Sequence, residues 1–210
     1  MEAIPGSEAG VPDMDLKLVA WARAVKARAT RRGRDPTPLW LFSDAERMPD
    51  IEGAVSRLPR GLCGVVFRHD RHPDRVAIAG RVARICRARR LTLVIAGDWR
   101  LAAQLRTGLH VRGGRGPARP LIKLITASAH DRVSLRRARR SKATTIFLSP
   151  AFPTLSHPGG VAWGPVRWSA LSIGAGETGT RVAALGGITG RTARRLPFNV
   201  AGAGGIGALV

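Results

Sequence analysis

Residues 62–96 read LCGVVFRHDRHPDRVAIAGRVARICRARRLTLVIA, and this stretch decides the fold that the sequence predicts. It begins and ends with a short, continuously apolar run, at 62–67 and 91–96. Between the two runs, apolar residues recur at helical spacing along one face of 74–90. Continuous apolar runs are typical of parallel strands that are covered on both faces, so the stretch predicts a strand–helix–strand unit.

The same alternation continues on both sides of this unit. We predict further strands at 39–43, 109–111, 121–126, 145–149, 182–185 and about 200–203. Stretches rich in Arg, Ala and Leu separate most of them with a helical period, most clearly at 131–140. This order predicts an α/β fold with one closed (β/α)8 TIM barrel. A doubly wound open sheet is the alternative, because the fourth and eighth strands are short and weakly marked.

The chain ahead of the first strand differs in composition, which divides the sequence into an N-terminal extension, 1–38, and a barrel domain, 39–210. Residues 1–13 are rich in Gly, Pro and Glu and predict a disordered start. From Leu16 onward, the spacing of apolar residues predicts one amphipathic helix, which ends in the segment 31–36. The pattern does not decide whether this helix closes the bottom of the barrel or packs on its side.

The net charge of +21 favours anionic partners, either nucleic acid or phosphorylated small molecules. A compositional bias toward Arg is the other explanation of this charge. Proteins that bind single-stranded nucleic acid stack bases on aromatic side chains, whereas aromatic residues are 5% of this chain and Tyr is absent. We therefore expect phosphorylated small molecules, in preference to nucleic acid, as partners.

Compartment and assembly are predicted from what the sequence lacks. Cys63 and Cys86 are too few for a disulfide framework and are expected to be reduced thiols. The first residues show no secretory signal, and no apolar run approaches the roughly 18 residues of a membrane span. We expect a cytoplasmic protein that makes no membrane contact, and the sequence leaves a homo-oligomer open.

Polar and glycine-rich segments follow nearly every predicted strand, where barrels of this kind gather their functional groups. In chain order they lie at 43–44, 68–72, 97–98, 112–115, 128–130, 149–157, 186–189 and 202–205. The last two segments predict a phosphate site, formed by Gly186, Gly187, Gly204 and Gly205, because backbone N–H groups in glycine-rich turns bind anions. The alternative is that the C-terminal glycines form a flexible, tightly packed end.

Three single residues have two interpretations each. Arg68 is placed to bind a phosphate or diphosphate, or is one more surface arginine. Asp98 is placed to hold Mg²⁺, or caps a helix that begins near Trp99. His130 is a candidate general acid and base, or an ordinary residue before a helix that Asp131 caps. We find no zinc-site spacing, Walker loop or Rossmann fingerprint.

The order of these motifs resembles that of the thiamine-phosphate synthase and TenI family, whose members are (β/α)8 barrels. The resemblance spans residues 39–210. It rests on FRHD at 67–70, GD at 97–98, GLHVRG at 108–113, SAH at 128–130, SPAFPT at 149–154 and GGI at 186–188.

The resemblance implies a transferase that joins hydroxymethylpyrimidine diphosphate to thiazole phosphate, giving thiamine phosphate and pyrophosphate. It implies that Arg68 and Ser128 contact the diphosphate and that Asp98 holds Mg²⁺. It also implies that Thr154 and Gly187 face the thiazole phosphate.

The chain departs from the family pattern at the diphosphate side. Asp70 stands where the family has Lys, and Gly97 stands where it has Asn. An expected acid is replaced within GGRG at 113–116, and His157 takes the place of a substrate-binding Lys. These departures predict a weakened Mg²⁺ site.

Two alternatives to the synthase follow from the same resemblance. TenI-like members isomerise a tautomer of the thiazole phosphate without diphosphate or metal, and they move the proton with a histidine at the position of His130. The altered diphosphate side favours this activity, whereas the retained Arg68 and Asp98 favour the synthase, which is the activity that we expect. A non-catalytic barrel that binds a phosphate ligand is the third alternative.

Overall fold

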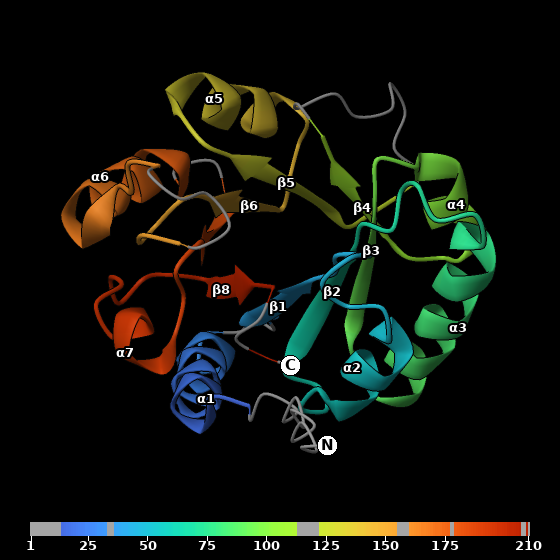
Figure 1. Cartoon of the computed structure of the whole chain (residues 1–210). Coiled ribbons are helices and arrows are strands. Elements are labelled where there is room, and N and C mark those ends of the chain that lie inside the picture. Colours follow the sequence, from blue (N-terminus) through green and yellow to red (C-terminus); the bar gives the residue numbers. More distant parts are fainter. Residues whose placement is uncertain are drawn as a thin grey trace, which may run out of the picture.

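The computed structural model describes residues 14–32, 36–112, 122–154, 160–176, 179–206 and 209, and in these ranges eight parallel strands close into a barrel (Figure 1). The strands are β1 Leu39–Phe42, β2 Cys63–Phe67, β3 Thr92–Ala96, β4 Gly108–Val111, β5 Ile125–Ala129, β6 Thr145–Leu148, β7 Arg181–Leu185 and β8 Gly202–Gly205. Each strand pairs with the next in sequence, and β8 pairs with β1. The predicted (β/α)8 barrel is confirmed and the open sheet is excluded.

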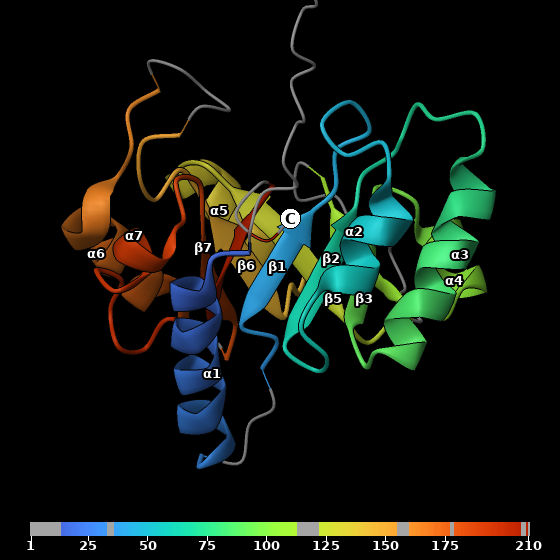
Figure 2. The ribbon, with the colours of Figure 1, turned by 60° about the horizontal axis from the view of Figure 1, so that its bottom comes forward.

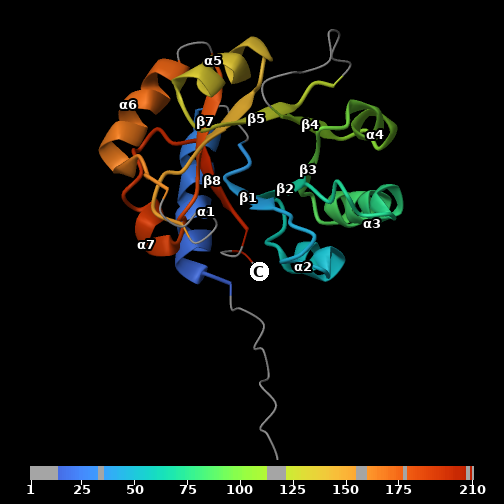
Figure 3. The same cartoon turned by 45° about the horizontal axis from the view of Figure 1, so that its top comes forward.

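Helices form an outer ring around the strands (Figure 3). Within the described ranges they are α1 Leu16–Thr30, α2 Ile51–Arg57, α3 Arg75–Ala88, α4 Trp99–Gln104, α5 Arg132–Arg140, α6 Gly164–Gly176 and α7 Gly190–Ala193. Helices α1, α6 and α7 cover one side of the barrel, and α2, α3 and α4 cover the opposite side (Figure 2). None of the helices in the described part of the chain has the length and apolar character needed to span a bilayer.

The helix ahead of the first strand packs on the side of the barrel, which answers the question that the sequence left open. Helix α1 lies against α7 and buries Leu18, Val19, Ala22 and Val25. The side chain of Asp15 joins the two helices, because its carboxylate accepts hydrogen bonds from the backbone N–H groups of Leu18, at 3.0 Å, and Gly190, at 2.6 Å. The predicted disordered start at 1–13 lies outside the described residues.

The buried apolar residues form two clusters, one on each face of the cylindrical sheet. The larger cluster fills the layer between the sheet and the helix ring. The smaller one fills the barrel itself and consists of Trp40, Phe42, Val66, Val94, Ala96, Phe147 and Ala183. Because side chains alternate along a strand, every second residue of each strand points into the barrel, and this alternation decides which polar residues reach the mouth.

Two strand positions differ from the prediction. Strand β5 begins at Ile125 and ends at Ala129, so Ser128 lies within the strand rather than after it. Strand β8 is Gly202–Gly205, so Gly204 and Gly205 belong to the strand and not to a loop. Gly204 is needed there, because a Cβ atom on it would lie 2.9 Å from Phe42 Cε2 inside the barrel. Low side-chain volume, which suggested a loop, here serves interior packing.

Candidate active site

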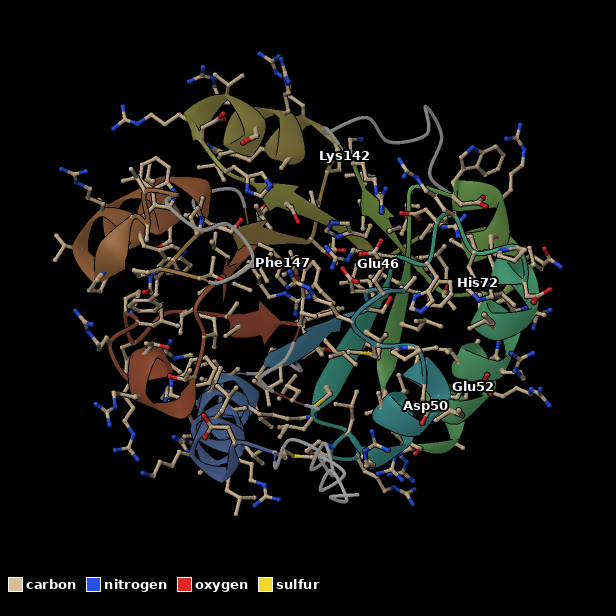
Figure 4. All side chains as sticks on the ribbon, in the orientation of Figure 1. Glu46, Asp50, Glu52, His72, Lys142 and Phe147 are labelled. Carbon is tan, nitrogen blue, oxygen red and sulfur yellow. The ribbon has the colours of Figure 1, made fainter. Side chains whose placement is uncertain are left out.

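The mouth of the barrel has an aromatic floor. The ring of Phe42 packs edge-on against Phe147, with centroids 4.8 Å apart, and against His110, at 5.8 Å. Phe147 is fully buried and points toward the centre of the barrel (Figure 4). Polar groups that approach this floor are therefore shielded from water on one side, which strengthens their interactions with a charged ligand.

Arg68 is fixed above this floor. Its guanidinium lies 5.5 Å from the centroid of the Phe42 ring, and its Nε donates to the backbone oxygen of Ser43 at 2.8 Å. The backbone N–H of Arg68 donates to Ser43 Oγ, also at 2.8 Å. Burial lowers the pKa of the Arg68 guanidinium, and Asp44, 3.7 Å away, opposes that shift. Arg68 is therefore a positioned cation at the mouth rather than a free surface arginine.

A buried histidine that we did not single out from the sequence lies beside Ser128. His110 Nδ1 is hydrogen-bonded to Thr126 Oγ1 at 2.8 Å, and its Nε2 to Ser128 Oγ at 3.2 Å. Burial lowers the pKa of His110 to about 3, and the guanidinium groups of Arg112 and Arg68 contribute to this shift. The imidazole is therefore neutral and fixes the Ser128 hydroxyl at the barrel mouth. The alternation of His110 and Arg112 along and just after β4 was the signal that could have revealed it.

The lowered pKa of His110 predicts a loss of stability in mild acid. In the unfolded chain this histidine has a pKa near 6.5 and becomes protonated in mild acid, whereas buried His110 stays neutral. Protonation therefore stabilises the unfolded state relative to the folded state as pH falls below about 6.5. We expect the free energy of unfolding to fall by about 2 kcal/mol between pH 7 and pH 5 because of this residue alone. Urea unfolding at several pH values measures the effect.

The matched control is His110→Gln, which keeps a hydrogen-bonding side chain that does not titrate. Its loss of stability should be smaller but not zero, because burial also lowers the pKa of His69. The same pH dependence in the variant and in the wild-type protein would show that His110 is not the source.

His130 lies at the rim, directly after β5. Its Nδ1 is hydrogen-bonded to Ser149 Oγ, after β6, at 2.8 Å, and Trp163 Nε1 donates to the backbone oxygen of Ser149 at 3.2 Å. The imidazole is exposed at the rim. Asp131, not His130, caps α5, because its side chain accepts from the backbone N–H of Ser134. The ring of His130 is thus oriented by Ser149, while the helix start is satisfied by its neighbour.

Two carboxylates on the β2–β3 side of the mouth, those of Asp70 and Asp98, are both engaged. Asp98 caps α4 through the backbone N–H of Leu101, at 3.0 Å, and its second oxygen pairs with Arg75 at 3.2 Å. Asp70 pairs with Arg75 at 3.2 Å and with Arg112. The structure therefore contains the helix cap that was the alternative interpretation of Asp98.

These residues do not fit a magnesium ion. Mg²⁺ requires carboxylate oxygens that it can reach, and a guanidinium lies between Asp70 and Asp98. In the described part of the chain, no group of three or more His, Cys, Asp or Glu side chains is arranged to hold a metal. The predicted role of Asp98 as a magnesium ligand stays a prediction that this geometry does not support.

The first glycine-rich turn follows β7 and packs against the loop after β6. Gly186 and Gly187 have φ values of +92° and +63°. A Cβ atom on Gly187 would lie 2.3 Å from the backbone oxygen of Pro153, so this glycine is required by packing whether or not it binds phosphate. Half-buried Thr154 lies in the same loop. His157 and the segment 113–116 lie outside the described residues.

Fold and site together define a (β/α)8 barrel with a polar mouth, where Arg68, Ser128 and His130 lie at the carboxyl ends of the strands. The model of the family described as thiamine monophosphate synthase matches residues 44–209, and the chain belongs to that family.

Solved structures of low sequence identity share the fold. Thiamine phosphate pyrophosphorylase from Pyrococcus furiosus superposes with a TM-score of 0.66 at 18% identity, covering 80% of this chain and 84% of that one. The protein of the same description from Bacteroides thetaiotaomicron gives 0.51 at 16%, with coverages of 82% and 83%. KDPG aldolase from Legionella pneumophila gives 0.53 at 13%, with coverages of 81% and 82%. A search of curated proteins finds no match.

Proposed function

We propose that this protein is an enzyme of thiamine biosynthesis that moves a proton on thiazole phosphate, the tautomerase activity of its family. The observation behind this proposal is the hydrogen bond between His130 Nδ1 and Ser149 Oγ at the exposed rim of the mouth. A histidine whose one nitrogen is held by a hydroxyl group can exchange a proton with a ligand through the other nitrogen.

The chemistry assigned to His130 is a single proton shift. His130 Nε2 takes a proton from one position of the thiazole, and the resulting imidazolium returns a proton to another position. The histidine is then neutral again, and the product has the same atoms as the substrate. Ser149 holds the ring orientation through both half-steps. Ser128, hydrogen-bonded to neutral His110 on the neighbouring strand, supplies a fixed hydroxyl at the barrel mouth.

We assign the binding of the thiazole phosphate to the segments in and after the strands that follow β5 in the barrel. Thr154, Gly186, Gly187, Gly204 and Gly205 belong to or follow β6, β7 and β8, which come after β5 and its histidine in the barrel order. Backbone N–H groups of a glycine-rich turn, such as Gly186–Gly187 after β7, suit a phosphate monoester. A substrate bound across them would extend its ring toward His130.

The synthase is the second candidate, and the position of Arg68 favours it. A guanidinium fixed over Phe42 is a preorganised cation of the kind that stabilises a departing diphosphate. Against it stands the balance of charge at the mouth, where Arg68, Arg75 and Arg112 are paired with Asp44, Asp70 and Asp98. The geometry therefore supports the proton shift better than the release of pyrophosphate.

Two assays on the wild-type protein separate these candidates. We expect interconversion of the thiazole phosphate tautomers at an unchanged rate in EDTA and in Mg²⁺. We expect no pyrophosphate release when both thiamine half-substrates are supplied. Pyrophosphate release without tautomerisation would establish the synthase instead. If neither reaction occurs but thiazole phosphate raises the unfolding temperature, the protein is a non-catalytic binder.

A further inference from the structure

Two carboxylates on the β2–β3 side of the mouth share one guanidinium. Arg75 Nη1 lies 3.2 Å from Asp98 Oδ2, and Arg75 Nη2 lies 3.2 Å from Asp70 Oδ1. Nη2 also donates to the backbone oxygen of Ala96 at 2.7 Å. Since Ala96 is the last residue of β3, this third contact fixes the guanidinium to the barrel wall. Arg75 is held from three directions.

The remaining oxygens of both carboxylates are also engaged. Asp98 Oδ1 accepts from the backbone N–H of Leu101, and Asp70 Oδ2 pairs with Arg112. The side chain of Arg75 is only 16% exposed, against 30% for Asp70 and 36% for Asp98. Because the cation is the most buried member, water screens these ion pairs less than it screens pairs on an open surface.

We infer that the guanidinium of Arg75 is the fixed cation of this site and takes the place of a divalent metal ion between Asp70 and Asp98. A metal ion that entered would have to displace Arg75 from both carboxylates and from Ala96, leaving a poorly exposed guanidinium without these partners. The fork geometry of arginine suits two carboxylates at once, which a lysine ammonium does not offer.

The same arrangement explains the charge reversal at position 70. Asp70 stands where the family pattern has Lys, and it accepts contacts from both Arg75 and Arg112. Arg112, directly after β4, is half-exposed, and its guanidinium has more N–H donors than its contact with Asp70 uses. A phosphorylated ligand at this side of the mouth would therefore meet a metal-free pair of arginines, Arg68 and Arg112.

The test measures manganese binding, with Mn²⁺ as the probe, by isothermal titration and by the unfolding temperature. We expect the wild-type protein to show no Mn²⁺ binding at the mouth. The variant Arg75→Met frees one oxygen on each of the two carboxylates and should bind Mn²⁺ at least about tenfold more tightly than the wild-type protein. Arg84→Met is the matched control, because Arg84 is an exposed arginine on the same helix, and it should behave as the wild-type protein does.

A double variant identifies the ligands. Asp98→Asn in the Arg75→Met background keeps a helix-capping side chain but removes one charge, so the gained Mn²⁺ affinity should disappear. The inference is overturned if Arg75→Met gains no affinity, or if the wild-type protein already binds Mn²⁺ as tightly as the variant.

If Arg75→Met does not fold, a measurement on the wild-type protein tests the inference by itself. Mn²⁺ that broadens the amide resonances of Asp70 and Asp98 in its NMR spectrum overturns the inference, and unbroadened resonances support it. None of these readouts uses a substrate. Their failure would leave the proposed tautomerase untouched, and a failed activity assay would leave this inference untouched.

Discussion

Replacing His130 with Asn lowers the rate of thiazole phosphate tautomerisation by about 100- to 10,000-fold, the range that a positioned general acid and base contributes. Asparagine can still donate a hydrogen bond to Ser149 Oγ through its amide nitrogen, as His130 Nδ1 does when Nε2 acts as the base, so the rim keeps its shape, but the amide cannot take up and return a proton. The measurement is kcat for the interconversion of the tautomers, in EDTA. We expect a fall in kcat with little change in KM, because the phosphate is bound elsewhere.

Two further variants show whether the loss belongs to proton transfer. Ser149→Ala should cause a smaller loss, since it frees the His130 ring without removing it. His72→Asn is the matched control, because His72 lies on the loop after β2 and its Nδ1 accepts a local backbone N–H, from Asp74. Wild-type turnover in His130→Asn would remove His130 from the mechanism and with it the proposed activity.

Local pattern predicts the strands and helices well because each one obeys a simple period. The apolar runs at 62–67 and 91–96 form strands β2 and β3, and each observed strand begins one residue after the start of its run. The prediction places β5 too early because it assigns the polar Ser128, just after the predicted end at Thr126, to the following loop. Thr126 and Ser128 face the barrel interior and are satisfied there by His110, a contact between strands that no local period reveals.

The ion pairs at the mouth could not be predicted for a different reason. With 35 lysines and arginines in the chain, nothing in the sequence distinguishes Arg75 from its neighbours. Nitrogen-tipped side chains surround the outside of the helix ring (Figure 4), yet Arg75 turns inward to Asp98, 23 positions away. Only the parallel arrangement of β2 and β3 brings these two residues together, so the altered cation site became visible only in three dimensions.

The glycines show that one composition can have two causes. The place of Gly204 and Gly187 in glycine-rich segments predicts that both bind phosphate. In the structure Gly204 makes room for Phe42, and Gly187 makes room for Pro153. Packing and phosphate binding both require a missing side chain, so the sequence alone does not separate them. A measurement that reports stability and ligand binding independently does.

Gly187→Ala supplies that measurement. An alanine at φ +63° is strained, and its Cβ atom would lie 2.3 Å from Pro153 O and 2.8 Å from Phe152 Cβ. We expect the free energy of unfolding to fall by about 2–4 kcal/mol, from backbone strain and overpacking together. Urea unfolding measures the loss.

Gly80→Ala is the control, since Gly80 lies inside α3 and a methyl group added to it would meet nothing within 4 Å. It should raise the free energy of unfolding by about 0.5–1 kcal/mol, the usual gain of alanine over glycine within a helix. If Gly187→Ala instead unfolds like the wild-type protein and only raises KM for thiazole phosphate, then phosphate binding, not packing, requires the glycine. A loss of stability together with a raised KM would mean that packing of the β6 and β7 loops against each other also shapes the phosphate site.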